Sequence, residues 1–153
     1  MDHGSALGMP SRGPLLSEPG RCDVNLSLPA RAENTALVRH VIGALGESLL
    51  LRSELVEDLR LVVTEAFTNV VRHAYGGREG PVDIAVRPGG ERLHITVTDR
   101  GRGMKPNPDS DGAGLGLPLI AALAEHFEIL QPAEGGSVLR ITIRHAPGRF
   151  QST

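Results

Sequence analysis

Three polar residues stand four positions apart in the stretch EAFTNVVRH: Glu65, Asn69 and His73. On a helix this spacing places the acid, the amide and the imidazole on one narrow stripe, beside the apolar face rather than opposite it. An amide oxygen suits Mg²⁺, and an acid one turn away can serve as general base toward a group that attacks a phosphoryl centre. The alternative is an exposed polar face on which His73 helps to cap the helix C-terminus.

A second candidate is the carboxylate in TDRGRGM, residues 98–104. The apolar residues before it alternate along a predicted strand, and the period of two places Asp99 on their inward side. An inward carboxylate needs a bonding partner, and the amine of a flat ring such as adenine can supply one. Gly101 and Gly103 would let the backbone approach that ring. The alternative is an aspartate that merely begins a turn.

The third candidate is a run of glycines in DGAGLGLPLI, residues 111–120. Gly112, Gly114 and Gly116 lead into a predicted helix, whose free N–H groups and positive dipole end favour phosphate. The run is neither a P-loop, because no Lys-Ser/Thr follows, nor the turn of a first βαβ unit. Taken alone, such a run is a weak signal, and the alternative is a flexible linker.

The remaining sequence predicts the elements that would position these residues. CDVNLSL alternates like a strand that Pro29 ends, and residues 32–47 and 54–74 show helical spacing, with Ser53 a possible N-cap and Gly76-Gly77 a stop. The segments PVDIAVRP and ERLHITVTD predict a hairpin around Gly89-Gly90. A mobile loop over 100–114, a helix over 115–127 with Pro118 in its first turn, and strands at about 127–131 and 137–144 complete the order. This order predicts a two-layer α/β sandwich, with a mixed, mostly antiparallel sheet covered on one face by helices.

Composition narrows the class of protein. The 153 residues, 40% hydrophobic, suit one domain, which we place at 21–146 between tails at 1–20 and 147–153. A net charge of -2 with scattered arginines indicates no general attraction to nucleic acid or to an anionic membrane. No apolar run reaches the ~18 residues of a membrane span, and no signal peptide is evident, so we expect a cytoplasmic protein. The single cysteine, Cys22, cannot form an internal disulfide, and we expect it to be buried at the start of a strand.

Together the motifs EAFTNVVRH, DRGRGM and GAGLGL resemble the N box and the two glycine boxes of the GHKL ATP-binding fold. That fold is shared by gyrase, histidine kinases and mismatch-repair ATPases. Within it the chain is most similar to the bacterial anti-sigma factor serine/threonine kinases, over roughly residues 22 to 145. The chain has no room for the phosphoacceptor helices of a histidine kinase or for a gyrase-like transducer domain, so we expect a stand-alone ATP-binding domain.

The resemblance implies a role for each matching residue. Glu65 matches the catalytic base, Asn69 the Mg²⁺ ligand, and Asp99 the residue that contacts the adenine amine. Ser137 matches, more weakly, a small hydroxyl residue of the last strand pair. The implied nucleotide-binding set is Asn69, His73, Asp99, Gly101, Gly103, Met104, Gly112, Gly114, Leu115, Gly116, Leu117 and Ser137. Pro118 has no counterpart to which we can assign a function.

The resemblance further implies a kinase that uses ATP and Mg²⁺ to phosphorylate Ser or Thr of an anti-anti-sigma partner and that sequesters a sigma factor. The helix over 32–47 is by similarity a candidate homodimer surface, and ordinary core packing explains it equally well. A competing interpretation is a binding module that holds ATP and sequesters a partner without transferring phosphate. A third is a nucleotide-binding accessory to a separate sensor protein.

Overall fold

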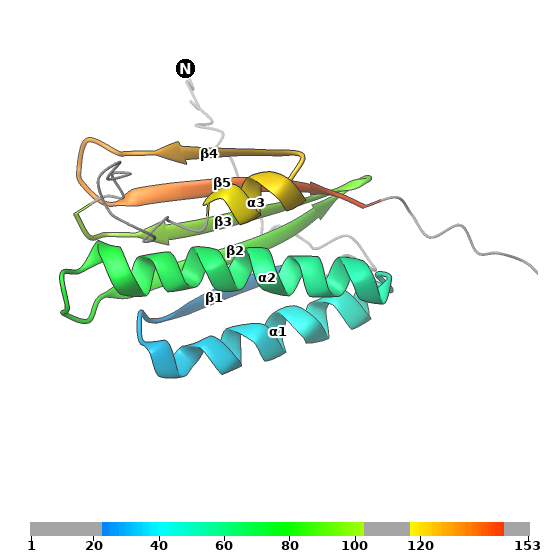
Figure 1. Cartoon of the computed structure of the whole chain (residues 1–153), viewed down its shortest axis with the longest axis horizontal. Helices are drawn as coiled ribbons and strands as arrows, with labels where there is room; N and C mark the ends of the chain where they lie inside the picture. Colours follow the sequence, from blue (N-terminus) through cyan, green and yellow to red (C-terminus); the bar gives the residue numbers. More distant parts are fainter. Residues whose placement is uncertain (1–22, 103–116, 146–153) are drawn as a thin grey trace, which may run out of the picture.

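The computed structural model describes residues 23–102 and 117–145. Within them the elements follow the order β1, α1, α2, β2, β3, α3, β4 and β5, with two short irregular helices η1 and η2 (Figure 1). The bounds are β1 Val24–Pro29, η1 Ala32–Asn34, α1 Thr35–Ser48, α2 Ser53–Asn69, η2 Val70–Ala74, β2 Pro81–Gly89, β3 Arg92–Asp99, α3 Leu117–Leu123, β4 His126–Leu130 and β5 Ser137–Arg144. The predicted two-layer α/β architecture is confirmed.

One five-stranded sheet carries the fold, in the order β1-β2-β3-β5-β4. Every pair of neighbouring strands in the described residues is antiparallel. The predicted hairpin joins β2 to β3, with Gly89 opposite Arg92 and Gly90 in the turn at a φ of 61°. β5 inserts between β3 and β4, so the ends of β3 and β5 meet where Asp99 pairs with Ser137.

The helices lie on one face of the sheet and enclose the core (Figure 1). α2 contributes a continuous apolar stripe, including Leu59, Val62, Ala66 and Phe67, all fully buried. Opposite it, the inward residues of the central strands form the other half of the same core: Ile84, Val86, Leu93, Ile95, Val97, Leu139 and Ile141. This packing fixes the rotation of α2, and therefore the direction in which its polar stripe points.

Two details differ from the sequence-based expectations, and a third expectation is not tested. Ser53 is the first residue of α2 and not its N-cap; Arg52 holds that position in extended backbone, and no side chain caps the helix. The predicted helix over 115–127 is described from Leu117 and ends at Leu123. It ends there because the Glu125 N–H donates to the Thr142 carbonyl at 2.9 Å, which commits the following residues to β4. Cys22 lies outside the described residues.

The predicted helix over 54–74 changes its geometry after Asn69. Val70–Ala74 form a π-helical turn, whose backbone bonds span five residues instead of four. In an α-helix each step of four residues overshoots a full turn by about 40°. A π-helical turn rotates less per residue, so this angular drift is smaller. About the helix axis, His73 therefore lies closer to the direction of Glu65 and Asn69 than it would in an unbroken α-helix.

Candidate functional site

A buried carboxylate lies where β3 ends and β5 begins. Asp99 is only 3% exposed, on the inward side of β3, as the strand period predicts. The Ser137 hydroxyl, itself fully buried on β5, donates to Asp99 Oδ2 at 2.5 Å, and the Gly101 N–H donates to Oδ1 at 2.9 Å. Each carboxylate oxygen has two lone pairs, so the group keeps capacity to accept from a ligand.

The polar stripe of α2 lies at the border of the core. Asn69 is 2% exposed, while Glu65 and His73 are half-buried. Glu65 and Asn69 both belong to the regular part of α2, so they lie one turn apart on the same face. The stripe therefore offers an amide and a carboxylate next to one another at the edge of the apolar layer and not on the solvent side.

Direct contact joins the end of the helix to the end of β3. The Arg102 N–H donates to the Ala74 carbonyl at 2.8 Å, one residue after His73. A Cβ at Gly101 would lie 2.0 Å from that same carbonyl oxygen, so only glycine fits there. The sequence predicted that Gly101 makes room for a flat ring, whereas its immediate neighbour in the structure is the helix backbone. Gly101 thus allows the α2–η2 helix and the residues after Asp99 to meet.

Two residues that the sequence reasoning did not select help to hold this junction. The Tyr75 hydroxyl donates to the Pro81 carbonyl and accepts from the Arg100 N–H at 3.0 Å, which ties the helix end to β2 and β3. Burial raises the pKa of Tyr75, against the opposing effect of the Arg100 N–H. Gly136, at a φ of 79°, donates its N–H to the Gly101 carbonyl at 3.0 Å. In the sequence, Tyr75 could have been singled out because it is an aromatic residue directly before Gly76-Gly77, where the helix was predicted to end.

The structure places some of the predicted residues together and leaves others outside its description. Asp99, Gly101 and Ser137 share one hydrogen-bonded cluster, which is joined through Ala74 to the turn that contains His73. Leu117 begins α3 and packs, partly buried, against the core. The other predicted residues lie outside the described ranges: Gly103, Met104, Gly112, Gly114, Leu115 and Gly116.

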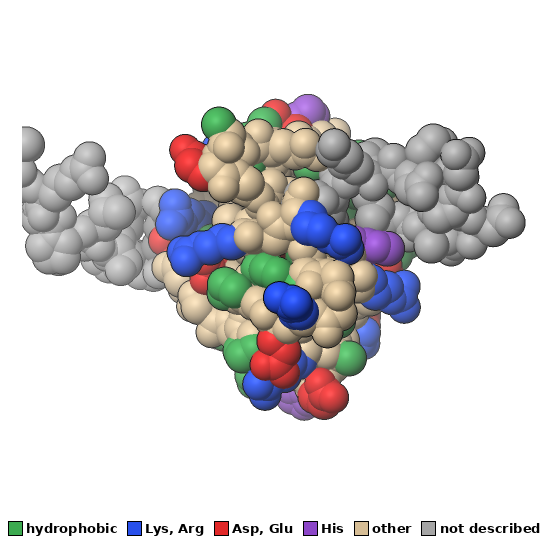
Figure 2. Space-filling view, turned by 90° about the vertical axis from the view of Figure 1, so that its left-hand side faces the viewer, with side chains coloured by type: hydrophobic (Ala, Val, Ile, Leu, Met, Phe, Trp, Pro, Cys, Tyr) green, Lys and Arg blue, Asp and Glu red, His purple; other side chains and the backbone are tan. Residues whose placement is uncertain are grey.

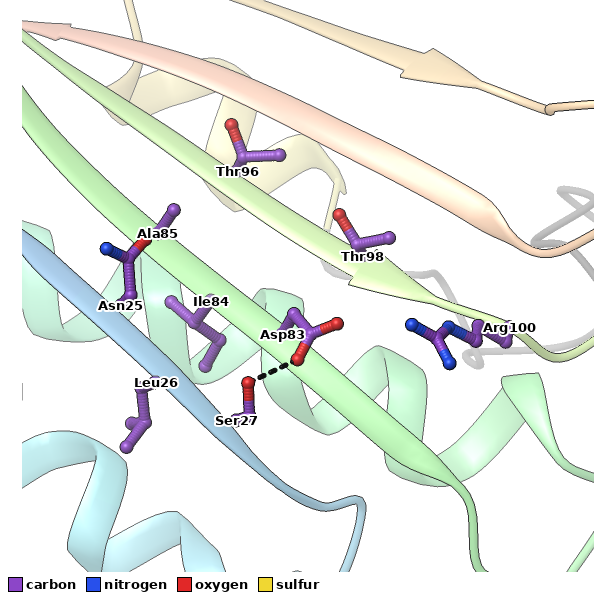
Figure 3. Close-up of a pocket in the computed structure, with 9 residues that line it drawn as sticks. All are labelled: Asn25, Leu26, Ser27, Asp83, Ile84, Ala85, Thr96, Thr98 and Arg100. Carbon is purple, nitrogen blue, oxygen red and sulfur yellow. Dashed lines mark hydrogen bonds between the residues drawn. The ribbon is translucent and has the colours of Figure 1, made fainter. Parts of the chain in front are cut away.

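The surroundings of this junction differ on the two faces of the sheet. On the helix side lie Asp99 and the α2 stripe. On the opposite face a shallow hollow is lined by polar side chains, among them Asp83, Thr96, Thr98 and Arg100, and the Ser27 hydroxyl donates to Asp83 Oδ1 at 2.5 Å (Figure 3). The hollow contains neither the acid nor the amide of the N-box stripe, so it is not the site that the motifs predict.

Comparison with known proteins defines the class. Residues 28–143 match the family described as the histidine kinase-like ATPase domain, and the chain belongs to this family. The match covers both the helix with the polar stripe and the strand pair with Asp99 and Ser137. The GHKL resemblance seen in the three motifs is therefore confirmed.

Individual relatives narrow the comparison within the family. The chain is 31% identical over 78 residues to the serine-protein kinase RsbW of Bacillus cereus (strain ATCC 10987 / NRS 248) and 35% identical over 81 residues to that of Bacillus pumilus (strain SAFR-032). Each match covers 51% of this chain and 49% or 50% of the relative, so the chain spans about half the length of these curated relatives. The solved structure of the RsbU and RsbW domains of Rv1364c from Mycobacterium tuberculosis covers 84% of this chain and 34% of its own, with a TM-score of 0.66 and 22% identity. That likeness concerns the fold.

Proposed function

We propose that the chain is an ATP- and Mg²⁺-dependent serine/threonine kinase that phosphorylates an anti-anti-sigma partner and sequesters a sigma factor. The observation that carries the proposal is the pairing of two half-sites: Glu65 and Asn69 on one face of α2, and the buried Asp99–Ser137 pair at the strand ends. The family of the chain and its similarity to serine-protein kinases RsbW support a kinase. If the bond between Asp99 and Ser137 had only a structural role, it would not explain the polar residues Glu65 and Asn69 on α2.

The residues present fit adenine and Mg²⁺. Asp99 is buried, and its carboxylate accepts hydrogen bonds from two protein donors. It retains lone pairs that can accept from the adenine amine. The buried amide of Asn69 offers the hard oxygen that Mg²⁺ prefers. When bound, Mg²⁺ would neutralise charge on the phosphates. His73, Gly101, Leu117 and Ser137, with the predicted residues outside the described ranges, complete the proposed nucleotide site.

Glu65 is the proposed general base. Its carboxylate accepts the proton that a partner serine or threonine hydroxyl loses, while the hydroxyl oxygen bonds to the γ-phosphorus and the bond to ADP breaks. Its half-buried position at the edge of α2 leaves it within reach of a protein substrate. Asn69 and Asp99, which are almost fully buried, instead orient the nucleotide.

The test is transfer of labelled γ-phosphate from ATP to candidate anti-anti-sigma domains, with wild type and Glu65→Gln compared side by side. We expect label on a partner with the wild type and a loss of about 100-fold or more with the variant, since general base catalysis contributes roughly that much. Mg-ATP affinity should remain within about twofold of wild type, because the variant keeps the size of the side chain. Equal loss of binding and transfer would remove Glu65 from the role of base.

The second candidate is a module that binds ATP and a partner without phosphate transfer. It is favoured over the kinase if Mg-ATP binds tightly and no candidate partner acquires label. A half-buried acid beside Asn69 argues for the kinase, since binding alone does not require a base.

A further inference from the structure

Four exposed arginines lie close to Tyr75, either along the chain or through backbone hydrogen bonds, at the end of the molecule where β3 terminates: Arg72, Arg78, Arg100 and Arg102, here called the arginine cluster. The Arg78 N–H donates to the Tyr75 carbonyl at 3.1 Å, and the Arg100 N–H donates to its hydroxyl. The Arg102 N–H donates to the adjacent Ala74 carbonyl. Arg72 stands three residues before Tyr75, on η2. The backbone of two chain segments, 72–78 and 100–102, is thereby brought together at the end of β3.

These arginines differ from most others in the described chain, because they lack an acidic partner. Ion pairs join Arg31 to Glu79, Arg60 to Glu57, Arg92 to Glu125, Arg140 to Glu128 and Arg144 to Glu91. None of the four cluster arginines is within ion-pair distance of a carboxylate among the residues that the structure describes. In the same loop, Glu79 is already engaged by Arg31. Figure 2, which faces this end of the molecule, shows several separate blue side chains among red and green ones.

The cluster also occupies a defined place relative to the proposed site. Arg100 and Arg102 both follow the buried Asp99 along the chain, on either side of Gly101. Arg100 points to the open face of the sheet, at the rim of the hollow (Figure 3). The Arg102 guanidinium lies against Gly76, where a Cβ would be 3.3 Å from it. The Arg102 charge thus lies at the helix end, and the Arg100 charge lies at the same end of the sheet but on its open face.

We propose that the arginine cluster is a docking surface for an acidic segment of the protein substrate, next to the residue that receives the phosphate. The proposal rests on the proposed kinase function and adds the chemistry of the partner. Unpaired guanidiniums favour carboxylates, which they bind through parallel hydrogen bonds. The chain carries a net charge of -2, so this positive field is local and suits a short acidic segment better than an extended polyanion such as nucleic acid.

The test measures binding without ATP, so its outcome does not depend on phosphate transfer. The probe is a short fluorescein-labelled peptide of alternating Glu and Ser, with a counterpart that has Gln in place of Glu. Fluorescence anisotropy would follow its binding to the full chain at low salt. The proteins are wild type, Arg100→Gln, Arg102→Gln, the double variant, and Arg102→Lys, with Arg87→Gln as matched control. Arg87 is an exposed arginine near the C-terminal end of β2, at the opposite end of that strand from Pro81 and the junction. It also has no ion pair to a described residue.

We expect the Glu peptide to bind and the Gln peptide not to bind. Each Arg→Gln change in the cluster should weaken binding roughly threefold, as for an exposed ion pair, and the double variant about tenfold. Arg102→Lys should restore much of the loss, and Arg87→Gln should change nothing. Mg-ATP affinity, measured separately, should stay within twofold for all variants.

Three results would overturn the proposal. Equal binding of the Glu peptide to the double variant and to wild type would show that the cluster does not receive it. Tighter binding of a single-stranded oligothymidylate, lost in the same variants, would assign the cluster to nucleic acid. A selective fall in Mg-ATP affinity would assign it to the nucleotide phosphates. None of these outcomes bears on whether Glu65 supports phosphate transfer to a partner.

Discussion

Asp99 illustrates how a single side chain is prepared for binding. Its carboxylate is held by one hydroxyl and one backbone N–H in a nearly buried position, so its orientation does not depend on a ligand. A carboxylate removed from water in this way has few competitors for its remaining lone pairs. The acceptor is therefore organised before the proposed adenine arrives.

Asp99→Asn should weaken ATP binding by about 10- to 100-fold, because a hydrogen bond to a charged acceptor is lost and an amide donor would face the amine. Isothermal titration calorimetry with Mg-ATP would measure the change. Asp83→Asn, on the opposite face of the neighbouring strand, is the matched control and should leave affinity unaltered. Unchanged affinity in Asp99→Asn would rule out the adenine contact.

At the scale of elements, the site depends on how closely the α2–η2 helix approaches the strand ends. Gly101 permits this approach, and Tyr75 and Gly136 add hydrogen bonds that keep the helix end, β2, β3 and the β4–β5 turn together. The π-helical turn between Asn69 and Tyr75 belongs to the same junction. A change here should disturb the relation between the two half-sites.

Gly101→Ala should lower the free energy of unfolding by about 3 kcal/mol, since its Cβ would overlap the Ala74 carbonyl and force the helix and strand apart. Gly90→Ala provides the comparison: it has open space but a φ of 61°, so backbone strain alone should cost about 1 kcal/mol. Urea unfolding would measure both. The proposal also requires weaker Mg-ATP binding in Gly101→Ala only; normal binding in that variant would show that the junction does not position the site.

At the scale of the whole molecule, one core supports both half-sites. The described part of the structure has a single hydrophobic core. Residues of α1, α2, α3 and all five strands either belong to this core or pack against it. Because the two half-sites share this core, a ligand that bridges α2 and the strand ends would stabilise the fold as a unit.

Within the described residues no helix is long and apolar enough to cross a membrane.

Mg-ATP at a hundred times its dissociation constant should raise the free energy of unfolding by about 2.7 kcal/mol. The chain has one tyrosine and no tryptophan, so the fluorescence of Tyr75 reports unfolding from inside the junction itself. Removing Mg²⁺ with a chelator should reduce the increase, and Asn69→Ala should make the chelator ineffective. If stability were the same with and without Mg-ATP, the proposed nucleotide site would be wrong.

The sequence was most informative where local periodicity governs structure. Alternation placed Asp99 on the buried side of its strand, and helical spacing placed Glu65 and Asn69 on one face, because both patterns follow from backbone geometry alone. It was least informative at element ends. The stop of α3 depends on a bond from Glu125 to β5, and the start of α2 at Ser53 has no side-chain cap to reveal it. The proposed domain limits and the roles of the site residues stay predictions.

By itself the sequence determined most of the elements and the two-layer class, and it proposed the candidate site residues, since these depend on residue types and short spacings. Only the tertiary structure decided that Ser137 bonds Asp99, that Gly101 meets Ala74, and that the backbone of Arg100 and Arg102 bonds Tyr75 and Ala74. Each of these contacts joins segments brought together by strand order and helix packing. Such contacts follow from the burial of one shared core, and no local pattern in the chain encodes them.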